Sequence, residues 1–129
     1  MTHWIESYLG QPWVAHEHDC WSFARRVWHE RFAIDVPVVA FDARSALACR
    51  RALEQQPERQ NWQSTGVPAE GDAVLMGKNA RPSHVGVWIA ADGGRVLHCL
   101  EGAGVVCNDL TSLKTAGWRV LGFYRRGPA

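Results

Sequence analysis

The sequence predicts a single domain of the α+β class, with helices in the first half of the chain and strands in the second. Hydrophobic residues recur at helical spacing up to about residue 56, and short apolar runs bounded by turn residues follow from about residue 73. Segregated helices and strands are typical of α+β folds rather than of alternating α/β folds. The 129 residues, 47% of them hydrophobic, suit one core spanning residues 1–129 and argue against disorder.

The most regular helical pattern runs from Asp19 to Phe32. Its apolar side chains recur at steps of three and four residues and share one face, which holds Cys20, Phe23, Ala24, Val27 and Trp28. Asp19 is placed to cap this helix, because its carboxylate can accept hydrogen bonds from the exposed amides of the first turn.

A second helix is expected from Asp42 to Gln56. One face of it holds Ala46, Cys49 and Leu53. Pro57 should end this helix, because proline cannot continue the helical hydrogen bonding. The polar stretch from Glu58 to Pro68 is predicted to be a loop.

About five antiparallel strands are expected after this loop. They are Ala73–Met76, His84–Ala90, Arg95–Leu100, Val105–Cys107 and Trp118–Arg125. The turn Asp92-Gly93-Gly94 is a strong hairpin signal. If the hairpin loop has an odd number of residues, His98 lies opposite Gly86 and on the same face as His84, whereas an even loop sends the two imidazoles to opposite faces. The sequence leaves this choice open.

Composition argues against several classes of function. Lys and Arg number 14 against 13 Asp and Glu, a formal net charge of +1 that does not suit a nucleic-acid-binding protein. The chain has no apolar run long enough to cross a bilayer, and its first residues do not resemble an export signal. We therefore expect synthesis in the cytoplasm without membrane insertion, and free thiols at the four cysteines.

Cys20, at the start of the first helix, is the strongest candidate for a nucleophile. Unpaired amides and the helix dipole favour its thiolate there, and the same amides can hold an oxyanion. His84 begins a strand beside a loop and can act as the base, and His98 can fix its tautomer from across the hairpin. The other cysteines are interpreted as packing residues: Cys49, Cys99 and Cys107.

Four short segments allow a comparison with a known family. They read DCWSF at residues 19–23, EGDAVL at 70–75, HVGVWI at 84–89 and VLHC at 96–99. In this order they resemble the motifs of the NlpC/P60 cysteine peptidases. The resemblance implies a papain-like fold, with the nucleophile helix packed on a small antiparallel sheet. It also implies hydrolysis of peptidoglycan stem peptides next to a D-γ-glutamyl residue, with Cys20 as nucleophile, His84 as base, His98 as orienting group and the Cys20 amide in the oxyanion hole.

Two positions depart from the family's usual pattern. Trp13 stands where a tyrosine is common, and Trp21 replaces a small serine. In cell-wall members, that tyrosine, the aspartate and the serine recognise a free L-alanine amine. The residues expected to bind substrate here are Trp13, His18, Asp19, Trp21 and Ser83. The DCW form is reminiscent of phage tail-assembly members, so the resemblance implies tail-tip proteins as partners and action at the cell wall.

Three alternatives remain open. His16, His18 and Cys20 alternate along the chain and could bind zinc, but they lack a second pair of ligands, so neither a metal nor another cofactor is expected. A non-catalytic tail protein or peptidoglycan-binding module would keep the fold and lose the chemistry. A papain-like acyltransferase would form the same thioester and pass the acyl group to another acceptor.

Overall fold

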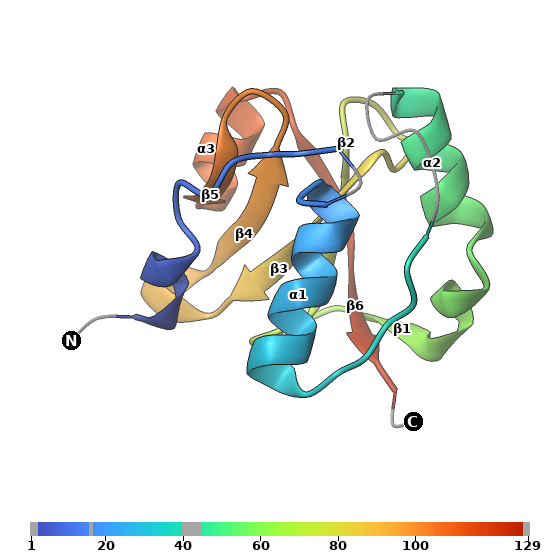
Figure 1. Cartoon of the computed structure of the whole chain (residues 1–129), viewed down its shortest axis with the longest axis horizontal. Helices are drawn as coiled ribbons and strands as arrows, with labels where there is room; N and C mark the ends of the chain where they lie inside the picture. The colour runs from blue at the N-terminus through green and yellow to red at the C-terminus, as the bar shows by residue number, and fades with distance from the viewer. Residues whose placement is uncertain (1–2, 16, 40–44, 128–129) are drawn as a thin grey trace.

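The computed structural model describes residues 3–15, 17–39 and 45–127, and the fold of these residues is α+β, as predicted (Figure 1). Within them, six strands form one antiparallel sheet in the order β1-β6-β2-β3-β4-β5. The strands are Trp62–Thr65 (β1), Ala73–Gly77 (β2), His84–Ile89 (β3), Arg95–Leu100 (β4), Gly104–Asn108 (β5) and Arg119–Arg126 (β6). The α-helices are Cys20–Phe32 (α1), Ala46–Gln55 (α2) and Leu110–Thr115 (α3).

Helix α1 packs against β3 and β4, and its predicted bounds and apolar face are confirmed. Asp19 caps the helix as expected, since its Oδ1 accepts a hydrogen bond of 2.9 Å from the Ser22 amide. The helix ends at Ala33, which takes a left-handed conformation with φ 55°. The cap fixes where α1 begins and therefore where Cys20 stands.

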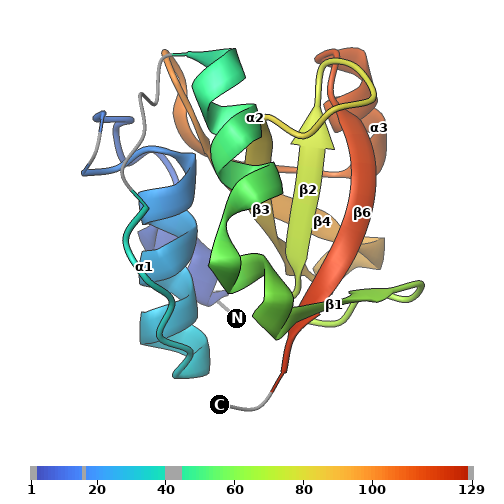
Figure 2. The same cartoon turned by 90° about the vertical axis from the view of Figure 1, so that its right-hand side faces the viewer.

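Helix α2 lies beside α1 (Figure 2). Residues of both helices, together with residues of β2 and β3, line an apolar cavity. Helix α2 begins after Ser45, whose hydroxyl accepts a hydrogen bond from the Ala48 amide at 3.1 Å. Its predicted end is confirmed to within one residue, because α2 stops at Gln55 and a short 3-10 turn starts at Pro57. The predicted start at Asp42 lies outside the described residues.

One strand and one α-helix of the described residues were not predicted. Strand β1 lies in the segment expected to be a loop, and that prediction is wrong: β1 pairs with β6 at the edge of the sheet. Its middle two side chains, Gln63 and Ser64, are polar and exposed, so it lacks the apolar alternation that marks a half-buried strand. Helix α3 has six residues, which is too short for a recognisable apolar stripe.

The sheet buries apolar side chains on both faces. The larger core lies under α1 and includes Val85, Val87 and Ile89 of β3. A smaller core on the opposite face gathers Trp88 with its neighbours around Leu113 of α3. Because β3 is buried on both faces, both sets of its alternating side chains are apolar except at its first residue, His84.

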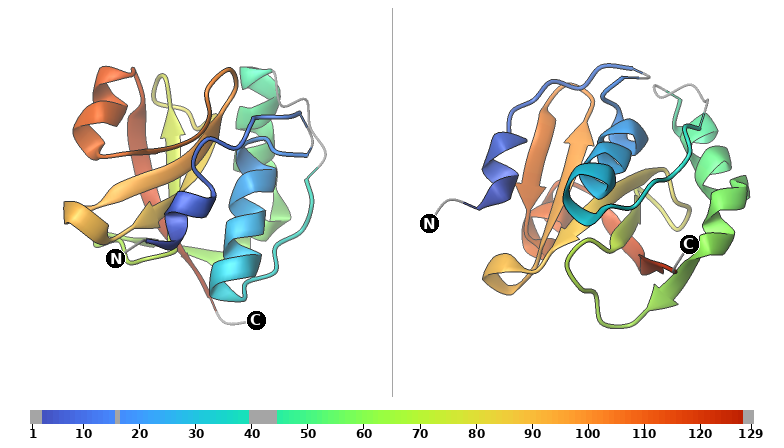
Figure 3. Two further views of the ribbon diagram at one scale, coloured as in Figure 1. Left: turned by 60° about the vertical axis from the view of Figure 1, so that its left-hand side comes forward. Right: turned by 60° about the horizontal axis from the view of Figure 1, so that its bottom comes forward.

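The N-terminal segment covers the free edge of β5. The amide of Gly10 donates to the carbonyl of Val105 at 3.0 Å, and the amide of Val105 donates to the carbonyl of Gln11 at 2.9 Å. Figure 3 shows this segment passing along β5 and continuing to the start of α1. It thereby brings Trp13 to the same end of the molecule as Cys20. Within the described ranges, no helix is long and apolar enough to span a bilayer.

Candidate active site

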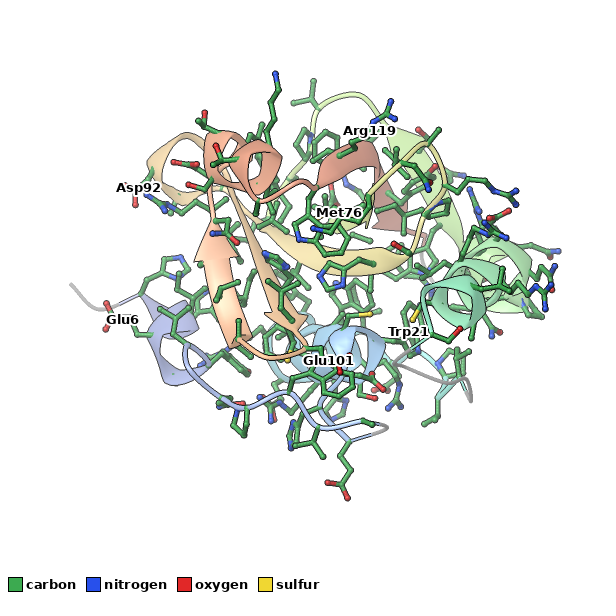
Figure 4. All side chains as sticks on the ribbon, turned by 90° about the horizontal axis from the view of Figure 1, so that it is seen from above. Glu6, Trp21, Met76, Asp92, Glu101 and Arg119 are labelled. Carbon is green, nitrogen blue, oxygen red and sulfur yellow. The ribbon has the colours of Figure 1, made fainter. Side chains whose placement is uncertain are left out.

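A cleft of about 490 Å³ opens at the start of α1. Four predicted site residues from three segments of the chain line it: Trp13, Cys20, and the neighbours Ser83 and His84. Glu101, in the turn between β4 and β5, lies on its rim, and Figure 4 shows it labelled close to α1, which is viewed almost end-on there. The fold therefore gathers the predicted nucleophile and the predicted base around one solvent-accessible space.

The Cys20 thiol sits against the first residues of β3. A hydrogen bond from the Val85 backbone amide reaches the sulfur, and Val85 directly follows His84. The pairing of β3 with β4 runs from Val87 to Ile89, so it stops short of this amide. The start of α1 thus meets β3 at a point where β3 is paired with β2 but no longer with β4, and the predicted nucleophile lies beside the backbone of the predicted base.

Burial raises the pKa of the Cys20 thiol well above its ordinary value, and neighbouring Cys49 adds to this shift. The Val85 amide favours the thiolate but only partly offsets burial. Burial thus opposes the thiolate that the helix start is expected to favour. Cys20 is 7% exposed, and this burial favours the protonated form of its thiol.

His84 and His98 form a buried pair. His84 Nε2 lies 2.9 Å from His98 Nδ1, and His98 is fully buried. The hairpin register pairs Ile89 with Arg95, so the loop has an odd number of residues and His98 stands opposite Gly86. A Cβ on Gly86 would come within 3.1 Å of the His98 Cβ, which shows why a glycine there makes room for the second ring.

Both imidazoles are held in the neutral form. Desolvation lowers the pKa of His84 well below its ordinary value, and the nearby His98 and Lys78 lower it further. Desolvation also lowers the pKa of His98, although its hydrogen bond to Asn108 works in the opposite direction. A neutral His84 is the form that can accept a proton from a thiol.

Trp118, which the sequence analysis did not assign to the site, packs on the other side of the His84 ring, and Lys78 packs on Trp118. The Trp118 ring stacks on His84 with centroids 4.6 Å apart and planes 23° apart. Lys78 Nζ lies 4.0 Å from the Trp118 ring centroid and donates to the Ala116 carbonyl at 2.9 Å. The His84 ring thus lies between an indole and a second imidazole, which together fix its plane.

Three predicted substrate-binding residues do not line this cleft. Trp21 is buried, and its indole N–H donates to the Pro37 carbonyl at 3.1 Å. The Asp19 carboxylate caps α1. His18 places its Nδ1 3.4 Å from an Arg26 guanidinium nitrogen. These side chains contact α1 or the segment that follows it, whereas Trp13 and Ser83 line the cleft.

The cysteines other than Cys20 differ in their surroundings. Each of the four, all of them among the described residues, is a free thiol, as predicted. Cys99 is fully buried and its thiol donates to the His18 carbonyl at 3.0 Å, which fits the packing role expected of it. Cys49 is also buried, but it lines the cleft together with Cys20.

The described residues supply no further ligands for the zinc site considered as an alternative. Across residues 3–15, 17–39 and 45–127, no group of three or more His, Cys, Asp or Glu side chains is arranged to hold a metal ion. His16, one of the proposed ligands, lies outside the described residues. Both ring nitrogens of His98, a further histidine of the site, are engaged by His84 and Asn108.

Asn108 is a further site residue that the sequence analysis missed. Its Oδ1 lies 2.7 Å from His98 Nε2. The signal that could have found it is the register of the β4–β5 hairpin, which sets Val106 opposite His98 and Val96 opposite Asn108. His98 and Asn108 are therefore diagonal neighbours on one face, like His84 and His98.

Comparison with known proteins shows which family the chain that forms this cleft belongs to. A scan against protein families matches residues 8–121 with the NlpC/P60 family, a span that includes every residue of the cleft named above. A search of curated proteins finds no match.

Proposed function

The chain belongs to the NlpC/P60 family, whose members are generally cysteine peptidases or amidases acting on peptidoglycan, and we propose that it cleaves stem-peptide amide bonds next to a D-γ-glutamyl residue. One observation carries this proposal: Cys20 and His84 line a single cleft, and the sulfur contacts the amide that follows His84. The family assignment supplies the substrate class, and the cleft supplies the residues for the reaction.

In the proposed reaction, the Cys20 sulfur attacks the stem-peptide carbonyl carbon while His84 takes the thiol proton. Because both groups are neutral at rest, proton transfer accompanies the attack instead of preceding it. Backbone amides at the start of α1, including that of Cys20, stabilise the oxyanion. His84 then protonates the departing amine, and a water molecule activated by His84 releases the acyl group from the thioester.

The nitrogen that exchanges this proton is His84 Nδ1. His84 Nε2 is already engaged with His98 Nδ1 at 2.9 Å. Nδ1 is therefore the ring nitrogen that can exchange a proton with the Cys20 thiol. His98 is the orienting group, because it keeps the ring from turning its other nitrogen toward the cleft.

We place this activity at the tip of a phage tail or a related particle. The feature that supports this setting is Trp21 in the DCW form of the nucleophile motif. Trp21 packs inside the domain and so leaves the cleft to other residues, among them Trp13 and Ser83. In this proposal those two side chains contact the stem peptide, and tail-tip proteins are the partners.

Mass spectrometry of muropeptides after incubation with purified peptidoglycan tests the function. Cys20→Ala should abolish cleavage without unfolding the protein, because alanine fits where the small thiol stood. The matched control, Cys107→Ala, removes a thiol from β5 outside the cleft and should cleave normally. Cleavage by Cys20→Ala would contradict the proposal. Binding without products would favour the non-catalytic module, and products extended by another acceptor would favour the acyltransferase.

A further inference from the structure

Asn108, the last residue of β5, ends a hydrogen-bonded chain that starts at His84. His98 connects the two, with its Nδ1 2.9 Å from His84 Nε2 and its Nε2 2.7 Å from Asn108 Oδ1. All three residues lie on strands, and the β4–β5 register fixes the diagonal between His98 and Asn108. The contact is therefore built into the sheet and does not depend on a loop.

The chemistry of these atoms fixes where each proton lies. An amide oxygen accepts hydrogen bonds and cannot donate them, so His98 Nε2 carries a proton. Burial keeps His98 neutral, so its Nδ1 carries a lone pair and accepts from His84 Nε2. His84 is also neutral, and its own lone pair is therefore on Nδ1.

We propose that Asn108 is a positioning residue that selects the tautomer of His84 through His98. This inference rests on the proposed function and deepens it. If the side chain of residue 108 donated to His98, both bonds would reverse and His84 Nδ1 would carry the proton. Such a ring could not accept the proton of Cys20. The site therefore needs a hydrogen-bond acceptor at position 108, and a polar residue of either kind would not suffice.

Two substitutions separate this role from simple packing. Asn108→Leu keeps the shape and removes the acceptor, and should lower kcat/KM by about 10- to 100-fold, mainly through kcat, at every pH. Asn108→Asp keeps an acceptor and should restore activity at alkaline pH. Its negative charge favours a protonated His98, which then donates to His84, so activity should fail on the acid side and the acid limb should move to higher pH.

A matched control and a readout that needs no turnover complete the test. Asn61→Leu removes an exposed amide that donates to Glu58 at 2.9 Å, and should leave the pH profile of activity unchanged. Long-range proton–nitrogen NMR of the imidazoles should show Nε2–H in both His84 and His98, and a tautomer mixture in Asn108→Leu.

A failure of this inference can be distinguished from a failure of the proposed function. Wild-type tautomers in Asn108→Leu would overturn the inference, as would an Asn108→Asp variant impaired equally at every pH. If the wild-type protein cleaves no peptidoglycan, the proposed function fails. The NMR spectra would still decide whether Asn108 sets the tautomer of His84.

Discussion

The three neighbouring strands β6, β2 and β3 bury polar groups at both of their ends, but in different ways. At the end where β2 begins and β6 ends, carboxylates are held by arginines. Asp72 is 4% exposed, and its two oxygens accept from Arg125 at 3.0 and 2.8 Å. Glu58 Oε1 lies 2.8 Å from Arg126 Nε. These charges have opposite charges beside them, and each pair joins separate segments of the chain.

At the other end, where β3 begins, the buried polar groups are neutral. Burial favours the uncharged forms of Cys20, His84 and His98. Neutral groups in contact can pass a proton without first breaking an ion pair. We therefore expect the ion-paired end to contribute to stability and the neutral end to contribute to the proposed reaction. Substitutions at each end test this division.

The largest expected effect comes from the base at the neutral end. His84→Ala removes the group that takes and returns the proton, and should lower kcat/KM by about 10²- to 10⁴-fold. His98→Ala should cost less, about 10- to 100-fold, because the Trp118 stack still holds the His84 ring. Steady-state kinetics on a stem-peptide substrate measures both variants, and circular dichroism checks that they fold. Equal losses would mean that His98 does more than orient the base.

Much of this end could be predicted from the sequence because short-range rules govern it. The apolar period and Asp19 locate the start of α1, and therefore Cys20. The turn at Asp92–Gly94 locates the hairpin that carries both histidines. Whether the rings share a face depends on the number of residues in the loop, which the sequence left open.

What the sequence could not predict depends on long-range packing. Trp118 reaches His84 from the residue just before β6, and Asn108 reaches His98 through a register that no turn motif announces. The helix start that favours the Cys20 thiolate is visible in the sequence, whereas the burial that raises the pKa of this thiol is not. Strand β1 was missed because an edge strand with exposed polar residues resembles a loop.

The ion-paired end should affect stability and leave activity intact. Asp72→Ala removes the acceptor for Arg125 and for the Ala69 amide, which donates to Asp72 at 2.7 Å. The free energy of unfolding should fall by about 1.5–3 kcal/mol, the usual range for hydrogen bonds to a charged group. Urea denaturation measures this change. Asp72→Asn, which keeps an acceptor for the Ala69 amide, should lose less.

Activity of the folded Asp72 variants tells the two ends apart. Under native conditions, kcat/KM of Asp72→Ala should equal that of the wild type, because Asp72 lies at the Trp88 end of β3, away from His84. A loss of activity as large as that of His98→Ala would show that the ion-paired end also controls the reaction. The division between the two ends would then be wrong.

The smallest expected effect is a shift in the pH profile caused by Lys78. This ammonium lowers the pKa of His84, after the larger contributions of burial and His98. Neutral His84 is the active form, so activity is lost as pH falls through its pKa. Lys78→Met removes the charge and keeps an apolar chain against Trp118, so the pKa of His84 should rise and the acid limb of kcat/KM should move to higher pH.

Lys114→Met is the matched control for this charge effect, since it removes the other lysine of the chain, near the end of α3. It should leave the acid limb in place, because Lys114 is not among the groups that shift the pKa of His84. High salt offers a second check, because screening should weaken the influence of Lys78 in the wild type and move its acid limb toward that of Lys78→Met. An alkaline limb that moves to higher pH in Lys78→Met, in place of the acid limb, would mean that the active form of His84 is the protonated one, and an acid limb that stays in place would mean that Lys78 does not influence the base.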